Sequence, residues 1–257
     1  MSHPSTSRVA PRDTRLTRLT RHATRARIVA PRFALAYVIE RARDSADVRA
    51  AAAVRALAFA SYDTTTRSPF AIRAHLGIKI DCESRALARK LSGGGVEDGG
   101  EEGWGDVAVA CVVARAPLAN GDFPIGFDIR ALDPSLLVSR PGEEMSVVIA
   151  SLDVCVGEKL PSEELVGASV GRRAYVANVS VVPPARRNGV ALAMISRALA
   201  IGTEFGVETM YAHVTKSNVA ARALYAEAGF EEEAREPNAV EATLGREPRL
   251  LLRRRVG

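Results

Sequence analysis

The sequence predicts a single α/β domain built around a mixed sheet, and three observations lead to that prediction. The 257-residue chain has an ordinary globular composition, with 47% hydrophobic and 25% charged residues, which is enough for one sizeable core. Apolar runs typical of buried strands lie at 107–114 and 145–156. From residue 175 onward strands alternate with amphipathic helices, as they do in α/β domains.

The net positive charge of the chain is concentrated in its first 36 residues. The chain carries +5 overall, but residues 1–36 contain eight arginines and a single acid, Asp13, so they carry +7 and the other 221 residues carry −2. The segment is also rich in Ser and Thr and has no sustained hydrophobic period, which is typical of an organelle transit peptide. We expect residues 1–36 to be a disordered transit peptide and residues 37–257 to form the domain. A disordered basic arm that binds RNA or membranes is the alternative.

The composition argues against several other classes of protein. No apolar run approaches the roughly 20 residues of a transmembrane helix, so we expect no membrane span. The three cysteines are widely spaced and the four histidines are scattered, so we expect neither a disulfide framework nor a metal site. No aromatic residue interleaves with the N-terminal arginines before Phe33, and residues 37–257 are net negative, so we expect no nucleic-acid partner.

The first half of the domain begins with a strand and two helices. Residues 34–41 alternate as a strand does, and Asp44 or Ser45 can cap a helix that runs to about residue 60. A second helix is expected over residues 70–90. Half of residues 92–105 are glycine, and this stretch lacks the Gly-Lys-Ser/Thr ending of a phosphate-binding loop, so we expect a mobile loop.

The remaining elements follow from apolar patterns and turn residues. Between the strands at 107–114 and 145–156, residues 117–142 are punctuated by Pro and Gly and are expected to be an insertion with a short strand at 125–130. The second half is expected to contain strands at 175–182, 209–215 and near 249–254, and helices at 188–205 and 219–228. The acidic stretches 97–106 and 231–236 are expected to be solvated loops rather than sites for a cationic acceptor.

The turn after the strand at 175–182 has the features of an anion-binding site. Pro183 and Pro184 end the strand, because proline cannot donate to the ladder, and Gly189 allows close approach at the start of the next helix. Unpaired N–H groups and the positive end of the helix dipole bind phosphate at such a position. The sequence therefore predicts a pyrophosphate cradle at Arg186, Arg187, Asn188, Gly189, Val190 and Ala191.

A second group of candidate residues lies on the helix at 219–228. Asn218 is a favourable N-cap residue, and Gly229 stands where a left-handed C-cap is wanted. Asn218 and Tyr225 are two turns apart, about 10 Å, and so share one face of the helix. Taken alone, the two residues have a structural explanation: Asn218 caps the helix and Tyr225 packs.

Residues 178–230 resemble the GNAT superfamily of acetyl-CoA-dependent N-acetyltransferases. Residues 186–191 match its Q/R-x-x-G-x-G/A motif, and residues 218–230 match its N-x-x-A-x-x-x-Y-x-x-x-G-F element. Weaker similarity to the plastid acetyltransferases of plants and algae extends to residues 151–165 and 248–252. The resemblance implies the GNAT fold: a mixed, mostly antiparallel sheet flanked by helices, with the strands at 175–182 and 209–215 splayed apart. It also implies an acetyl-CoA core at about 145–235 and a location in the plastid stroma, with the mitochondrial matrix as the alternative.

The resemblance also implies roles for particular residues. Besides the cradle, the residues implied to hold acetyl-CoA are Val179, Ser180, Val181, Asn218, Ala221 and Tyr225. Tyr225 is implied to protonate the leaving thiolate. Tyr175 and His213 are similar in position to a Tyr and a His that share a catalytic water in protein N-terminal acetyltransferases. The alternative is that His213 is a hydrogen-bonded strand histidine and Tyr175 a packing residue.

These features together predict acetyl transfer from acetyl-CoA to protein amines. The expected acceptors are N-terminal α-amino groups, with lysine ε-amines of organellar proteins as a second acceptor class. The alternatives are a small amine, such as an arylalkylamine or a polyamine, and a module that binds acetyl-CoA without turnover. The sequence leaves open the acceptor specificity and the oligomeric state.

Overall fold

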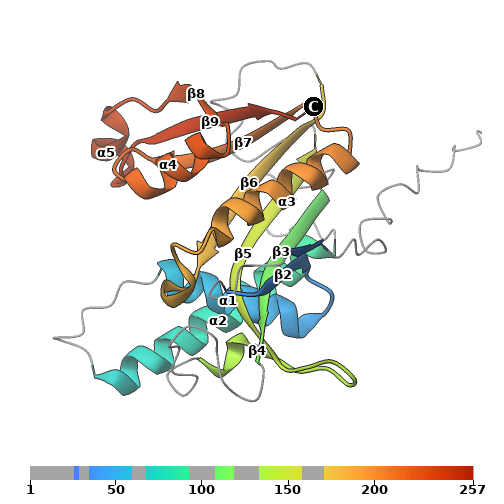
Figure 1. The fold of residues 1–257 in the computed structure, drawn as a ribbon. Helices are drawn as coiled ribbons and strands as arrows, with labels where there is room; N and C mark the ends of the chain where they lie inside the picture. Colours follow the sequence, from blue (N-terminus) through green and yellow to red (C-terminus); the bar gives the residue numbers. More distant parts are fainter. Residues whose placement is uncertain are drawn as a thin grey trace, which may run out of the picture.

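The computed structural model describes residues 26–28, 35–59, 68–92, 108–118, 133–157 and 171–256, with the backbone alone described at 26–28. One sheet of nine strands forms the centre of this part of the chain, and helices lie on both of its faces (Figure 1). The glycine-rich loop expected at 92–105, after its first residue, and the short strand expected at 125–130 lie outside the described residues.

The strands follow the order β1-β2-β3-β5-β6-β7-β9-β8, with β4 paired to β5. Every pair in this order is antiparallel except β6 and β7, which run parallel. The strands are β1 (Ala26–Ile28), β2 (Tyr37–Arg41), β3 (Ala108–Pro117), β4 (Leu137–Val138), β5 (Ser146–Gly157), β6 (Arg173–Val181), β7 (Thr209–Thr215), β8 (Glu231–Arg235) and β9 (Arg249–Arg255).

The helices divide between the two faces of the sheet. The helix α3 (Val190–Glu204) crosses one face and also contacts α4 (Val219–Glu227), whereas α1 (Ser45–Phe59) and α2 (Pro69–Leu91) pack together on the other face (Figure 1). A short helix α5 (Ala239–Leu244) precedes β9. None of the helices in the described ranges is both long and apolar enough to cross a bilayer.

The helix α1 begins and packs as its residues dictate. The side chain of Asp44 accepts a hydrogen bond from the backbone N–H of Asp47, 3.0 Å away, and so caps the first turn. The alanines at 50–53 are fully buried, and their small side chains allow the helix to lie close to the sheet. The predicted helix at 45–60 is therefore confirmed, as are those at 70–90, 188–205 and 219–228 to within a few residues.

Two parts of the sequence prediction do not match the structure. Residues 231–236 were expected to be a solvated loop, and this expectation is wrong: Glu231–Arg235 form β8, and Glu236 is buried. The strand lies at the edge of the sheet with neither face buried, so it lacks the hydrophobic alternation that marks a strand in sequence. The strand β1 lies within the segment expected to be outside the fold, and pairs with β2.

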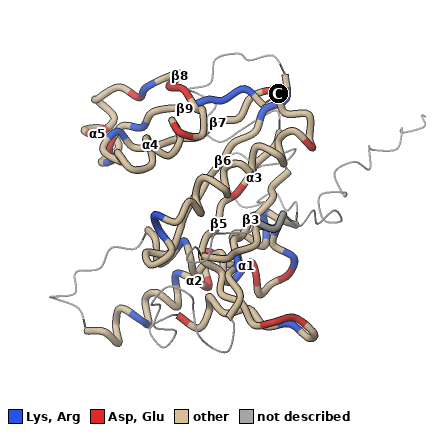
Figure 2. Tube along the Cα trace, viewed as in Figure 1, with Lys and Arg blue, Asp and Glu red and all other residues tan. Residues whose placement is uncertain are grey.

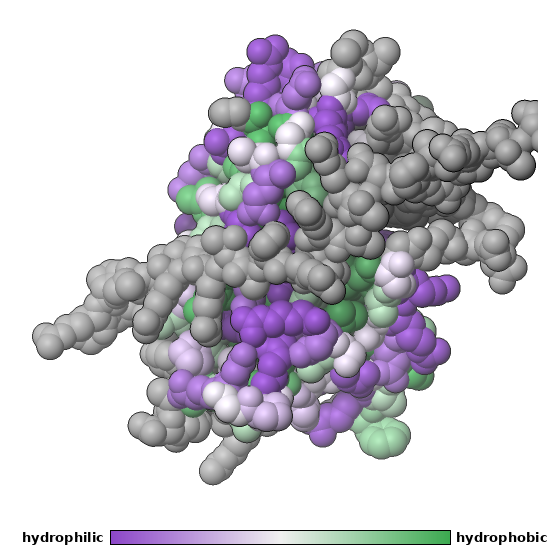
Figure 3. Space-filling model, turned by 90° about the vertical axis from the view of Figure 1, so that its right-hand side faces the viewer, coloured by the Kyte–Doolittle hydropathy of each residue, from purple (hydrophilic) through white to green (hydrophobic). Residues whose placement is uncertain are grey.

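On the face seen from the side of β2 and the β4–β5 turn, hydrophilic residues dominate the described surface and hydrophobic residues form only small, separate areas (Figure 3). The interior is correspondingly apolar. One hydrophobic core extends across both faces of the sheet, from β2 to β9. A second, much smaller cluster centres on Tyr211 and Leu251, with Tyr175 and Ala234 against it.

Candidate active site

The strands β6 and β7 pair for only part of their length. The pairing runs from Arg173 opposite Thr209 to Val176 opposite Ala212, and then stops. Beyond that point β6 continues along β5 and β7 continues along β9, so the two strands diverge (Figure 1). The parted strand pair implied by the resemblance is therefore confirmed. It leaves the inner edges of both strands with backbone groups that have no strand partner among the described residues.

A β-bulge in β6 accompanies the divergence. Asp153 pairs with Ala177, but Ser151 pairs with Ser180, so β6 contains one residue more than β5 over this stretch. Asn178, within the bulge, has a φ of 55°, which few residues other than glycine adopt. Bulges bend the strand that carries them and turn its side chains and backbone groups to new directions. The backbone of residues 178–181 is thus set apart from the regular ladder where the strands divide.

A buried ion pair holds the bulge in place. The Asn178 side chain donates from Nδ2 to Asp153 Oδ2 at 2.9 Å, and Arg55 of α1 donates from Nη2 to Asp153 Oδ1 at 2.6 Å. The side chains of Arg55 and Asp153 are both only 3% exposed. Both oxygens of this buried carboxylate are therefore paired, one with a cation and one with an amide. The sequence analysis missed this group.

Arg55→Met is expected to destabilise the protein by about 3–5 kcal/mol, because it leaves the Asp153 carboxylate buried without its cation. Arg49→Met on the same helix is the matched control. Arg49 pairs with Asp81 at 2.6 Å, but these side chains are 48% and 45% exposed, and such surface pairs contribute about 1 kcal/mol or less. Equal losses of unfolding free energy in denaturant titrations of the two variants would show that the Arg55–Asp153 pair is no stronger than a surface pair.

The predicted cradle leads from β6 into α3. After the tight turn Pro183–Ala185, Arg187 and Gly189 both have positive φ, 64° and 71°, and Gly189 is the residue before the first helical turn. No hydrogen bond joins the backbone N–H groups of residues 187–192 to any described residue. A Cβ on Gly189 would have nothing within 4 Å. Free N–H groups at a helix start beside open space fit a diphosphate.

The polar side chains of the cradle mostly shape its own loop. Arg186 donates from Nε to the Val181 carbonyl at 3.0 Å, and Asn188 donates from Nδ2 to the carbonyls of Ala185 and Arg186. These bonds link the end of β6 to the start of α3. The backbone of the cradle, rather than its arginine and asparagine side chains, therefore supplies the preorganised donors.

The next helix carries Asn218 and Tyr225. Asn218 Oδ1 accepts from the Ala221 N–H at 3.0 Å, so the predicted capping role is confirmed. Tyr225 is 5% exposed and packs edge-on against Phe230, with ring centroids 5.3 Å apart. Burial, with a further contribution from Tyr175, raises the pKa of the Tyr225 phenol well above its ordinary value. The hydroxyl therefore keeps its proton at neutral pH and is available as a hydrogen-bond donor.

Tyr175 and His213 meet across β6 and β7. The Tyr175 hydroxyl lies 2.8 Å from His213 Nδ1, and the rings are tilted with centroids 5.6 Å apart. Burial raises the pKa of Tyr175 to about 12. Burial, followed by the positive charge of Arg249, lowers the pKa of His213 to about 4. The pair thus presents a protonated phenol and a neutral imidazole beside the point where the strands divide.

The lowered pKa of His213 predicts a pH dependence of folding stability. The unfolded chain, with an ordinary pKa of 6.5, binds more protons than the folded protein between about pH 4 and 6.5, so stability falls as pH decreases through that window. His213→Gln is expected to lose less unfolding free energy than the wild type between pH 7 and about 4.5, as measured by denaturant titration. Parallel losses in the two proteins would contradict a depressed pKa of His213.

A cluster of charged residues lies where β8 ends and β9 begins. Glu236, at the end of β8, accepts hydrogen bonds from both terminal nitrogens of Arg246, at 2.6 and 2.8 Å. It also accepts from the Arg249 backbone N–H at 2.8 Å and from its guanidinium at 2.8 and 3.2 Å. The hydrogen bonds from Arg246 and Arg249 hold the pKa of Glu236 far below its usual range. Sequence reasoning placed Glu236 in a solvated loop, because the partners that bury it lie ten and thirteen residues further along the chain.

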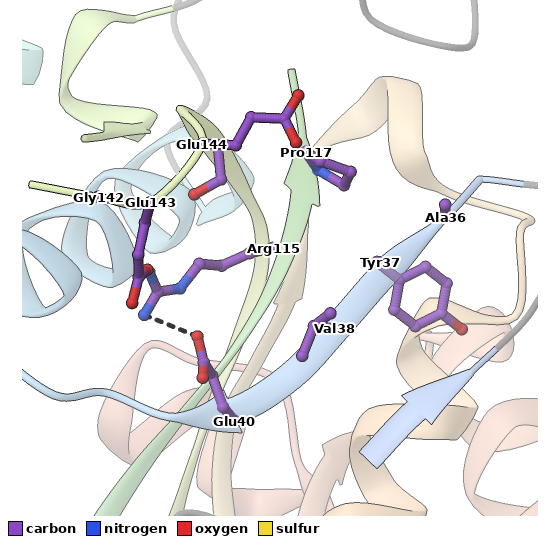
Figure 4. A pocket seen from close by; sticks show the side chains of 10 residues that line it. Ala36, Tyr37, Val38, Glu40, Arg115, Pro117, Gly142, Glu143 and Glu144 are labelled. Carbon is purple, nitrogen blue, oxygen red and sulfur yellow. Dashed lines mark ion pairs between the residues drawn. The ribbon is translucent and has the colours of Figure 1, made fainter. Parts of the chain in front are cut away.

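The structure also contains a cavity of about 560 Å³ that the sequence did not predict (Figure 4). It lies between β2, the end of β3 and the turn before β5, and Arg115 at its wall pairs with Glu40 at 2.9 Å and with Asp47 at 2.8 Å. None of the predicted site residues lines it. The predicted residues lie instead along β6 and β7, at the start of α3 and on α4.

A sheet that opens between two parallel strands, with a phosphate cradle at the following helix, is the architecture of an acyl-CoA-dependent acyltransferase. Residues 137–230 match the family model described as "Acetyltransferase (GNAT) family". Over 222 residues the chain is 32% identical to GCN5-related N-acetyltransferase 7, chloroplastic, of Arabidopsis thaliana, an alignment that covers 84% of this chain and 75% of the relative. Over 96 residues it is 33% identical to GCN5-related N-acetyltransferase 6, chloroplastic, of the same plant, which covers 32% of this chain and 33% of the relative. Among solved structures, the ribosomal-protein-S18-alanine N-acetyltransferase from Escherichia coli aligns with a TM-score of 0.46 and 17% identity over 86% of this chain and 94% of that chain.

The chain belongs to the GNAT family of GCN5-related N-acetyltransferases. It is therefore an acetyl-CoA-dependent N-acetyltransferase with the GNAT fold, as the resemblance of residues 178–230 implied. The free N–H groups and open space of the cradle fit the diphosphate of coenzyme A.

Proposed function

We propose that this enzyme acetylates the α-amino groups of protein N-termini in plastids, with lysine ε-amines as a weaker second class of acceptor. The observation that carries the proposal is the 2.8 Å contact between the Tyr175 hydroxyl and Nδ1 of a neutral His213 at the division of β6 and β7. The plastid location is supported by the arginine-rich, acid-poor first 36 residues and by the chloroplastic names of both curated relatives.

Both backbone groups and side chains bind acetyl-CoA in this proposal. The N–H groups of residues 187–192 hold the diphosphate, and the unpaired edge of β6 at Val179, Ser180 and Val181 holds the pantetheine arm. Asn218 and Ala221, at the start of α4, and Tyr225, near its end, flank that arm. Acetyl-CoA supplies an activated thioester, which a free amine attacks without any further cofactor. As the C–N bond forms and the C–S bond breaks, Tyr225 gives its hydroxyl proton to the departing sulfur, and the proton that the acylated nitrogen loses to water restores the Tyr225 hydroxyl.

The weakness of His213 as a base favours an α-amine as acceptor. Because His213 gains a proton only near pH 4, it is too weak a base to take a proton readily from a strongly basic, protonated amine. The α-amino group has a pKa of about 7.7–8.0, so about half of it is free near pH 8, whereas a lysine ε-amine with a pKa of about 10.4 is less than about 1% free. Tyr175 and His213 can align such a free amine or an intervening water, and accept hydrogen bonds from it.

Acetyl transfer to matched acceptors, followed by mass spectrometry, tests the proposal. One peptide carries a free N-terminus and a blocked lysine, its partner carries a blocked N-terminus and a free lysine, and spermidine and an arylalkylamine complete the set. We expect the first peptide to be acetylated fastest at pH 8, with the lysine peptide slower. Faster acetylation of either small amine would refute a protein acceptor.

A further inference from the structure

We infer that Glu236, Arg246 and Arg249 form a positively charged rim that makes the acceptor site select peptides with a carboxylate next to the reactive amine. This inference rests on the proposed function, because it concerns the peptide whose N-terminus lies at Tyr175 and His213. It adds the chemical class of acceptor, an N-terminus followed by Asp or Glu.

The register of the sheet places the rim on the same face as the Tyr–His pair. In the β7–β9 ladder His213 lies opposite Leu251 and Thr215 lies opposite Arg249. Paired residues, and residues two positions apart on one strand, point to the same face of a sheet. His213 and Arg249 are therefore diagonal neighbours, about 7–8 Å apart at their Cα atoms by ordinary sheet geometry.

The floor between these groups is apolar and closed. Leu251 of β9 also pairs with Ala234 of β8, and together with Tyr211 they form the small hydrophobic cluster that Tyr175 adjoins. Glu236 stands two residues beyond Ala234, and its backbone N–H donates to the Arg249 carbonyl at 3.0 Å. An acceptor whose amine reaches Tyr175 and His213 would therefore extend over this floor toward the rim.

The rim presents its positive charge outward. The side chains of Arg246 and Arg249 are 36% and 31% exposed, whereas that of Glu236 is only 7% exposed. Two guanidinium groups against one carboxylate leave one net positive charge, and it is the cations that an incoming peptide contacts. The nearby Glu247 directs its carboxylate at Ser217, whose backbone N–H and hydroxyl both donate to it at 2.5 Å, and among the described residues it forms no ion pair with Arg246 or Arg249.

The charged residues of the rim also act on His213. Burial is the largest cause of the lowered pKa of this histidine; Arg249 comes next and lowers it further, Glu236 raises it, and Arg246 lowers it by a smaller amount. Basic residues also run along β9 toward its end (Figure 2). A second ammonium close to the reactive amine is therefore disfavoured at this position, and a carboxylate is favoured.

Three peptides that differ only at their second residue, Asp, Asn or Lys, test the inference with the full-length enzyme. At low salt we expect kcat/KM to be about tenfold higher for the Asp peptide than for the Lys peptide, with Asn between them. The ratio is expected to shrink toward unity in about 0.5 M NaCl, because the rim is partly exposed and is screened. Arg246→Glu is expected to reverse the order, and Arg246→Gln to flatten it.

Arg235→Glu is the matched control. It makes the same change of charge on β8, but Arg235 is 52% exposed, pairs with Glu232 and, as the neighbour of Glu236 in sequence, points to the opposite face. The control is expected to keep the wild-type order of peptides. Equal kcat/KM for the three peptides, or the same order in Arg246→Glu as in the wild type, would overturn the inference while the proposed N-terminal acetylation stands. Failure to acetylate any of the three N-termini would overturn both.

Discussion

Tyr225→Phe is expected to lower kcat about a hundredfold and to leave the affinity for acetyl-CoA nearly unchanged, because only the proton donor is removed. The phenyl ring preserves the edge-on contact with Phe230 and the burial of this position. The buried phenol holds its proton at neutral pH, so no other protonation state of Tyr225 has to be considered. Steady-state kinetics gives kcat, and calorimetry gives the affinity for acetyl-CoA.

Tyr37→Phe on β2 is the control for this change. It removes a hydroxyl from another buried tyrosine, 8% exposed, that lies four strands away from β7 in the sheet. We expect this control to keep nearly wild-type kcat. An unchanged kcat in Tyr225→Phe would remove the acid role from Tyr225, and a matching loss of acetyl-CoA affinity would assign it to binding.

Gly189→Val is expected to abolish measurable acetyl-CoA binding. The residue has a φ of 71°, which a β-branched side chain tolerates poorly, so the turn that aims the N–H groups of the cradle would change. A Cβ at this position has nothing within 4 Å in the protein itself, and the space it would enter is the space in front of the helix start. Isothermal titration with acetyl-CoA measures the effect.

Gly206→Val separates the loss of binding from the strain of the substitution. Gly206 has a φ of 64° and also has nothing within 4 Å of a built Cβ, but it follows the other end of α3. Both variants are therefore expected to lose similar amounts of thermal stability, whereas Gly206→Val still binds acetyl-CoA. Retained binding in Gly189→Val would mean that residues 187–192 do not hold the diphosphate.

The parts of the site that sequence could predict are those whose chemistry is local. The cradle lies within six residues, and Asn218 and Tyr225 lie on one helix, so spacing alone identifies both groups. The Tyr175–His213 contact spans 38 residues, and the resemblance to N-terminal acetyltransferases, rather than any periodicity, suggested it. The divergence of β6 and β7 was likewise implied by the resemblance to the GNAT superfamily and not by the hydrophobic pattern of the sequence.

Other parts depend on long-range contacts that leave no local pattern. Arg55 and Asp153 are 98 residues apart, one in an alanine-rich helix and the other in an apolar strand, and only the packing of α1 on β5 brings them together. The sequence showed only that each apolar stretch contains a charged residue, which did not indicate that the two residues form a pair. The error at Glu231–Glu236 has a similar origin, because β9 supplies the ladder and, with Arg246, the cations that make this acidic segment ordered.

The hydrogen-bonded group of Arg55, Asp153 and Asn178 limits how short an active fragment of this enzyme can be. Residues 145–235 include the cradle, the divided strands and the acid candidate, but the cation that neutralises Asp153 comes from α1. A fragment cut to that interval would retain every residue predicted to touch acetyl-CoA and yet carry an uncompensated anion at its centre. The helix α1 is therefore structurally required by the part of the chain that binds acetyl-CoA, and we expect a truncation that removes α1 to destabilise that part.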